Sequence, residues 1–161
     1  MKSIISYPDE VKIDELDRKI LQILAPNARA QIIDMAHKLK VTPKTMIARI
    51  KELERKNVIV GYKTVFDIWK MDYQYYKIHF NLHNVIENKI EAFRVYVKNH
   101  PNIIYYDEVL GGDDFEIEVQ LKSDEELRKL IDNIKDNFSN MIKGYKTMLY
   151  YKEHKYLLLP V

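Results

Sequence analysis

Residues 14–66 read DELDRKILQILAPNARAQIIDMAHKLKVTPKTMIARIKELERKNVIVGYKTVF, and this stretch decides the fold of the first half of the chain. Apolar residues recur at helical spacing in three short segments, with breaks at Pro26-Asn27 and around Lys40. The third segment is rich in lysine and arginine, and Thr42 can cap it because proline suits the next position. Three short helices with a basic third one predict a helix-turn-helix that enters the major groove of DNA.

The third helix is expected to run from Pro43 to about Asn57, with Met46, Ile50 and Leu53 as its buried stripe. The segment 58–66 is expected to form a strand pair, or wing, that turns at Gly61. Side chains outside the stripe can meet phosphates or base edges, and Arg49 and Lys44 are the strongest candidates. The full set of candidate DNA contacts is Thr42, Lys44, Thr45, Ala48, Arg49, Lys51, Arg55 and the wing residue Lys63. The alternative is a structural helix with a solvated basic face.

Composition limits the classes of protein to consider. The 161 residues allow one domain or two small ones, and the absence of cysteine excludes disulfides, thiol nucleophiles and cysteine metal sites. Residues 1–64 hold 13 Lys/Arg against 8 Asp/Glu, a net charge of +5, whereas the rest of the chain is net −3. A basic first half favours a polyanionic partner. No apolar run approaches the roughly 18 residues of a membrane span, and the start lacks a signal-peptide pattern, so we expect a cytoplasmic protein without a membrane partner.

The second half changes from helical to alternating periodicity. Strands are expected at about 76–82, 103–110, 114–121 and 145–156, and helices at 88–99 and from the cap Ser123 onward. The order β-α-β-β-α-β predicts a ferredoxin-like module. The fold class is therefore α+β, with an N-terminal arm and winged helix-turn-helix at 1–63, a linker at 64–72 and an α/β module at 73–161.

Both helices of such a module cover one face of the sheet and leave the other face open. Depending on register, the open face would carry Tyr105 or Tyr106 and Tyr150 or Tyr151. A half-apolar face rich in tyrosine is suited to self-association, so we expect a homodimer.

The chain resembles the Lrp/AsnC, or feast/famine, transcription regulators over most of its length. The resemblance rests on IDELDRKILQIL at 13–24, on VTPKTMIARIKELERKNVIVGY at 41–62 and on the turn GGDDF at 111–115. One departure is Lys40, where the family usually has glycine, and a left-handed lysine costs about 1 kcal/mol. A second departure is the long arm Met1–Lys12.

The resemblance implies a DNA-binding regulator whose second module binds a small effector, usually an amino acid, and whose dimers often assemble into larger rings. The expected ligand site comprises Gly111, Gly112, Asp113, Asp114 and Thr147. In that site, turn amides would hold a carboxylate, and Asp113 or Asp114 would hold an ammonium group.

Two other function classes stay open at this point. Tetrapyrrole-pathway decarboxylases resemble the same two-part architecture, so the fold alone does not exclude an enzyme. A ligand-sensing assembly module without DNA binding is the other alternative. We expect no cofactor, since the sequence has no Gly-rich phosphate loop. We also expect no metal, because His79 and His83 lie about 13 Å apart along a strand and cannot share one ion.

Overall fold

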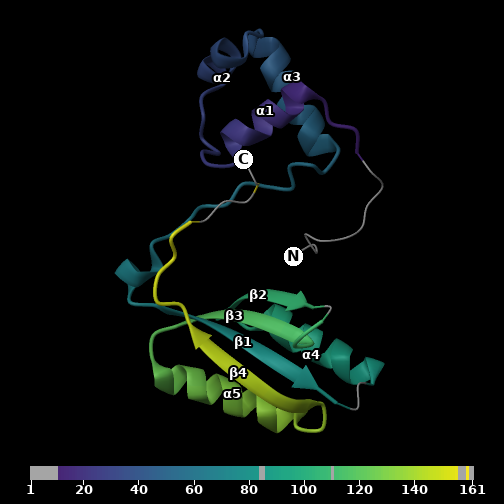
Figure 1. Ribbon diagram of the computed structural model, residues 1–161, viewed down its shortest axis with the longest axis vertical. Helices are drawn as coiled ribbons and strands as arrows, with labels where there is room; N and C mark the ends of the chain where they lie inside the picture. Colours follow the sequence, from purple (N-terminus) through teal and green to yellow (C-terminus); the bar gives the residue numbers. More distant parts are fainter. Residues whose placement is uncertain (1–10, 84–85, 110, 156–158, 160–161) are drawn as a thin grey trace. The chain divides into compact units, whose positions relative to one another are not determined.

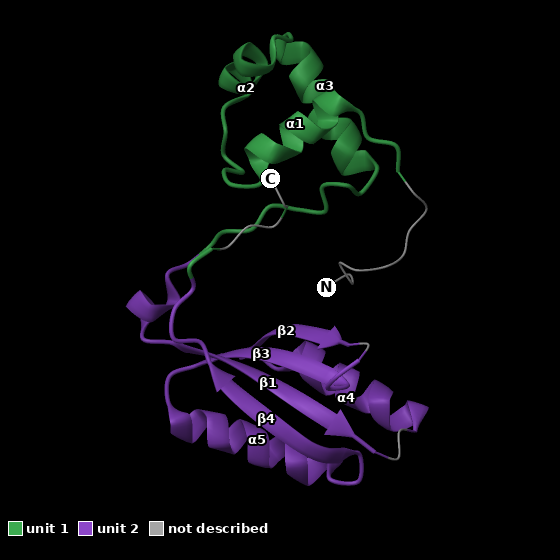
Figure 2. Ribbon diagram, in the orientation of Figure 1, with its two compact units in different colours: residues 1–65, 154–161 green, residues 66–153 purple. Residues whose placement is uncertain are grey.

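The computed structural model describes residues 11–83, 86–109, 111–155 and 159. The chain forms two compact units, the first comprising residues 1–65 with 154–161 and the second residues 66–153 (Figure 2). Three parts of the predicted elements lie outside the described residues: the first ten residues of the arm, Leu110 of the strand predicted at 103–110, and Tyr156 of the strand predicted at 145–156.

Three helices build the first unit: α1 (Glu15–Leu24), α2 (Ile32–Leu39) and α3 (Pro43–Arg55) (Figure 1). Asp14 caps α1 in a reciprocal capping box with Asp17, and Thr42 caps α3 by accepting a hydrogen bond from the amide of Thr45. The apolar stripes meet in one core made of Ile20, Met35, Ala36, Met46, Ile50 and Leu53. The predicted helix-turn-helix and the buried stripe of α3 are confirmed.

In the described part of the first unit, Lys40 and Asn57 take a left-handed conformation just beyond the end of a helix. Lys40 stands after α2 with φ 56° and ψ 42°, so the turn keeps the left-handed geometry although lysine occupies it. Asn57 has φ 55° beyond α3, and the amides of Val58 and Ile59 both donate to the Leu53 carbonyl. These bonds satisfy the end of α3 and turn the chain away from the helix axis.

Residues 58–66 form no strand in the described chain, which corrects the predicted strand pair. A hairpin on its own is marginal in water, and this one would bury little. Val58 and Ile59 pack on the helical core, whereas Val60 and Val65 are exposed. The phenol of Tyr62 donates to Glu54 at 2.8 Å and ties the segment to α3.

The second unit begins with a short 3-10 helix, η1 (Ile68–Met71), inside the predicted linker. It continues as β1 (Gln74–Leu82), α4 (Glu87–Asn99), β2 (Ile103–Glu108), β3 (Phe115–Leu121), α5 (Asp124–Phe138) and β4 (Ile142–Leu149). The sheet is antiparallel with strand order β2-β3-β1-β4, as Figure 1 shows. The predicted β-α-β-β-α-β module is confirmed, and Ser123 caps α5 as expected.

Alternation along the strands divides the sheet into a covered face and an open face. Residues such as Ile78, Phe80 and Ile117 are fully buried with Phe93 of α4 and Ile134 of α5, so both helices lie on the same face. The last strand starts and ends earlier than the predicted 145–156. A bulge at Asn81/Leu82 lets β4 begin at Ile142, and β4 ends close to the start of β1, its partner in the described sheet.

None of the helices in the described part of the chain has the length and apolar character that crossing a bilayer requires.

Candidate functional site

One face of α3 combines exposure with positive charge. Lys44, Ile47, Ala48 and Lys51 follow the spacing i, i+3, i+4, i+7, which places them within about 100° of one another around the helix. All four are exposed, and the buried stripe of α3 lies on the opposite side. Ile47 is 43% exposed and was missing from the predicted contacts, although the same spacing applied to apolar residues would have found it.

The start of α3 carries two hydroxyl groups. Thr42 Oγ1 and Thr45 Oγ1 lie 2.9 Å apart, and Thr42 also accepts from the Thr45 amide at 3.1 Å. The first amides of α3 and these hydroxyl groups form a site suited to an anionic oxygen such as a phosphate.

Arg49, a predicted base or phosphate contact, forms ion pairs with two carboxylates of the first unit. Its Nη1 lies 2.6 Å from Asp14 and 3.3 Å from Asp17, and the Asp17 side chain is only 9% exposed. The Asp17 amide and the Arg49 guanidinium both hold the pKa of Asp14 below its usual value. Arg49 therefore connects α3 to the start of α1, and it lies to the side of the Lys44–Lys51 face.

The other predicted cations differ in their surroundings. Arg55 makes two hydrogen bonds to Glu52, at 2.7 and 2.6 Å, and these bonds lower the pKa of Glu52 to about 2. Lys63 lies in the exposed segment after α3. Lys44 and Lys51 are predicted cations that lie on the exposed face of α3, with Ile47 and Ala48 between them along the helix.

The glycine turn between β2 and β3 has the backbone that its sequence predicts. Gly111 and Gly112 have φ 84° and 100°, and apart from chain neighbours no atom of a described residue lies within 4 Å of where a Cβ would stand on either glycine. Asp114 stabilises the turn, because its carboxylate accepts a hydrogen bond from the Leu82 amide at 2.7 Å and its own amide donates to the Phe80 carbonyl. Asp113 instead turns its carboxylate toward the open face of the sheet.

The structure does not bring all predicted ligand residues together. Asp113 lies 3.3 Å from Nδ1 of His79 and 3.8 Å from Nζ of Lys146, and His79 and Lys146 pair across β1 and β4. Thr147 pairs with Ile78, whose side chain is buried on the helix-covered face. Neighbouring residues of a strand point to opposite faces, so Thr147 and Asp113 stand on different sides of the sheet.

The open face carries a network of charges rather than an apolar surface. Lys77 lies 3.0 Å from Glu116 and 3.2 Å from Glu118, and His79 lies 3.1 Å from Glu116. Burial lowers the pKa of Lys77, but its bonds to the two glutamates outweigh burial and raise the pKa above its usual value.

Tyrosines border this network. The register places Tyr105 on the open face and Tyr106 on the covered one, where it packs against the core. Tyr150 stacks on Tyr75 with ring centroids 4.6 Å apart, while Tyr151 is almost fully exposed. The tyrosine-rich surface predicted from sequence is therefore limited to one border of a charged face.

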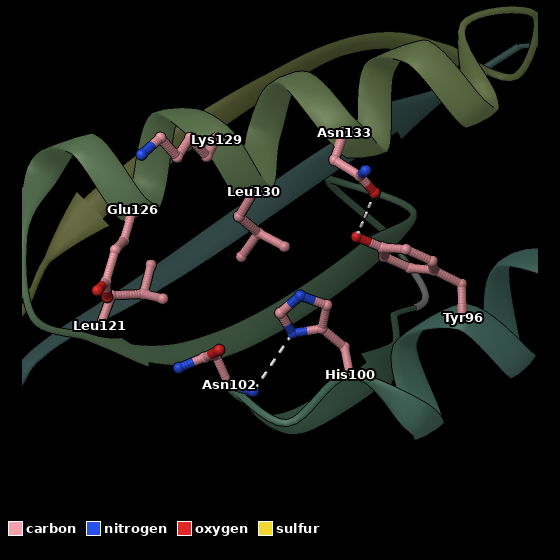
Figure 3. A pocket seen from close by; sticks show the side chains of 8 residues that line it. All are labelled: Tyr96, His100, Asn102, Leu121, Glu126, Lys129, Leu130 and Asn133. Atoms are coloured by element: carbon pink, nitrogen blue, oxygen red, sulfur yellow. Dashed lines mark hydrogen bonds between the residues drawn. The ribbon is translucent and has the colours of Figure 1, made fainter.

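A groove of about 470 Å³ lies between the C-terminal end of α4 and α5 (Figure 3). Its polar groups largely satisfy one another: Tyr96 donates to Asn133 at 2.8 Å, and the Asn102 amide donates to His100. Burial lowers the pKa of His100, so its imidazole is neutral near pH 7. None of the predicted ligand residues lines this groove.

No cluster of three or more His, Asp or Glu residues able to hold a metal ion occurs in the described ranges. The Nδ1 atom of His79 lies 3.3 Å from Asp113 and 3.1 Å from Glu116, and its Nε2 is buried without a hydrogen-bond partner among the residues that the structure describes.

Comparison with known proteins assigns each unit to a domain family. Residues 13–60 match the winged helix-turn-helix DNA-binding domain, and residues 77–158 match the Lrp/AsnC ligand binding domain. The HTH-type transcriptional regulator AldR of Mycolicibacterium smegmatis is 28% identical over 142 residues, covering 87% of this chain and 82% of that protein. The regulator FL11 of Pyrococcus horikoshii is 26% identical over 145 residues, covering 90% and 93%.

Solved structures agree with the architecture. A transcriptional regulator from Neisseria meningitidis in complex with L-Met superposes with a TM-score of 0.83 at 18% identity and covers 92% of this chain and 97% of that one. Escherichia coli AsnC gives a TM-score of 0.75 at 20% identity, with 91% and 97% covered. At these identities the likeness establishes the fold.

Proposed function

Because this chain belongs to the Lrp/AsnC family of transcriptional regulators, we propose that it recognises operator DNA with the exposed face of α3 and responds to an amino acid. The chain is a DNA-binding, effector-modulated regulator and not an enzyme, since its named relatives are regulators. A cytoplasmic location is part of the proposal.

The proposal rests on one observation: α3 exposes a face with Lys44 and Lys51 next to its N-terminus, which Thr42 caps. Two lysines about two turns apart can contact phosphates on either side of a groove, and Thr42 and Thr45 offer hydroxyl groups to a further phosphate. Arg49 contributes by fixing the helix rather than by reaching DNA, because Asp14 and Asp17 hold its guanidinium.

A homodimer completes the proposal. The open face of the sheet is self-complementary in charge. Lys77 of one copy could pair with Glu118 of a second copy, and Glu118 of the first with Lys77 of the second. The stacked Tyr75 and Tyr150 add apolar area at its border. We place the DNA-binding domain at 1–63, the linker at 64–72 and the dimerising module at 73–161, with larger rings as a further level of assembly.

Selection from random duplex DNA tests the proposed function. A dimer presents two copies of α3, so the enriched sequences are expected to be pseudo-palindromes with half-sites about 34 Å, or one helical turn, apart. Recovery of sequences without any common element would contradict the proposal. Enrichment of a single unrepeated half-site would retain DNA reading and contradict the dimer.

The proposed effector site is centred on the glycine turn and Asp113. The Lys146 ammonium is 3.8 Å from Asp113 and its side chain is 73% exposed, so the ammonium group of a ligand could replace it at little cost. The glycines let a ligand carboxylate approach the backbone closely. The Neisseria regulator solved with L-Met shows one amino acid bound to this fold.

Binding of an amino acid at this site is tested by thermal denaturation of the protein in the presence of each of the twenty amino acids. A ligand at about 100 times its dissociation constant is expected to stabilise the protein by about 2.7 kcal/mol. Asp113→Asn should remove the shift, whereas Asp136→Asn on the exposed side of α5 should keep it. An unchanged melting temperature with all twenty would contradict an amino-acid effector. Gly112→Trp is less informative, because φ 100° strains any side chain at that position.

A further inference from the structure

The centre of the exposed face of α3 is apolar. Ile47 and Ala48 stand between Lys44 and Lys51 on this face, and neither of them can form a side-chain hydrogen bond. Ile47 leaves 43% of its surface exposed although the buried stripe of the same helix is fully packed. A single exposed isoleucine is ordinary on a protein surface, so its meaning depends on what the surrounding face contacts.

The polar side chains that commonly read bases are engaged elsewhere on this helix. Arg49 contacts Asp14 and Asp17 through its Nη1, and Arg55 donates to Glu52 through its Nε and Nη2. The two lysines are suited to phosphates as compact point charges. The side chains left at the middle of the face are therefore Ile47 and Ala48.

In the major groove, the thymine C5-methyl group is the apolar feature on the base edges, and small apolar side chains contact it. Building on the proposed function, we propose that Ile47 and Ala48 read thymine methyl groups and thereby set the sequence preference of this regulator. Lys44 and Lys51 then position the helix on the backbone, while the apolar pair discriminates thymine from the other bases. The discrimination comes from burying a methyl group against Ile47 and requires no hydrogen bond.

Replacement of thymine by deoxyuridine isolates this contact, because deoxyuridine lacks only the methyl group. In the duplex enriched by selection, each thymine is replaced in turn and the affinity of the full-length protein is measured. We expect a loss of about four-fold at one or two positions in each half-site, as the transfer of one methyl group predicts. Equal affinity for thymine and deoxyuridine at every position would overturn the inference.

Two variants assign the contact to a residue. Ile47→Ala keeps a good helix former and should bind the thymine duplex about as weakly as wild type binds the deoxyuridine duplex, with no further loss on deoxyuridine. Ile33→Ala is the matched control, because Ile33 lies on α2 and is 69% exposed. It should keep the full thymine preference. Loss of the preference in both variants would overturn the assignment to Ile47.

The outcomes separate this inference from the proposed function. If selection enriches no sequence, the proposed function fails and the inference fails with it. If a sequence is enriched but deoxyuridine has no effect, DNA recognition stands and the apolar reading is wrong.

Discussion

Lys44→Glu/Lys51→Glu is expected to abolish operator binding while leaving the protein folded. Both side chains are exposed and lie away from the core of the first unit, so the substitutions remove no packing. Each lysine that meets a phosphate supplies a charge-assisted hydrogen bond, and reversal of its charge adds repulsion. We expect the affinity to fall by at least about 100-fold, measured by fluorescence anisotropy with the selected duplex at physiological salt.

A charge-matched variant tests whether the face, and not net charge alone, is responsible. Arg18→Glu/Lys19→Glu changes the charge equally on exposed positions of α1. It should weaken DNA binding far less, because it reduces only the long-range electrostatic attraction between the protein and DNA. Equal losses in both variants would show that α3 has no special role, and full binding by Lys44→Glu/Lys51→Glu would exclude the proposed interface.

Arg49→Ala is expected to destabilise the first unit. The substitution leaves Asp17, which is almost buried, without its cation and breaks the link between α1 and α3. An unpaired buried carboxylate costs about 1–3 kcal/mol in the free energy of unfolding. DNA affinity should fall to a similar degree for every sequence, because the helix that carries the reading face is less firmly held. Denaturant unfolding and anisotropy measure the two effects.

A double-mutant cycle assigns this loss to the ion pair. Arg49→Ala/Asp17→Ala should lose less than the sum of the single variants, with a coupling of about 1 kcal/mol. Arg18→Ala removes an exposed arginine from α1 and should change stability by less than about 0.5 kcal/mol. If Arg49→Ala is as stable as wild type and relaxes the preference at one base pair only, Arg49 reads DNA as the sequence first suggested.

The architecture could be predicted from sequence because its signals are local. Helical spacing around Ile20 and Ile50, the caps Thr42 and Ser123, and the alternation in β3 each depend on neighbours a few residues away. The limits of β4 were missed because they depend on β1, a strand more than 60 residues earlier, and on a bulge in it. Strand ends of this kind are set by pairing rather than by composition.

The site was harder to predict because its contacts are long-range. Arg49 and Asp14 are 35 residues apart, so the sequence around Arg49 predicts a nucleic-acid contact and gives no sign of the ion pair with Asp14 that the folded unit forms. Ile47 is not among the candidate contacts, although its spacing from Lys44 and Lys51 places it on the same face as Ala48, which is one of them. Thr147 was placed with Asp113 by resemblance, whereas the register of β4 against β1 puts it on the other face.

The ratio of the affinities for selected and unrelated DNA tests whether this protein reads a DNA sequence through α3. Anisotropy titrations of the full-length protein with two duplexes of equal length, at one physiological salt concentration, give this ratio. A regulator that reads sequence through α3 is expected to bind the selected duplex about 1,000-fold more tightly or better. Equal affinity for the two duplexes would show that the exposed face of α3 attracts DNA only through nonspecific charge, and would contradict sequence recognition by α3.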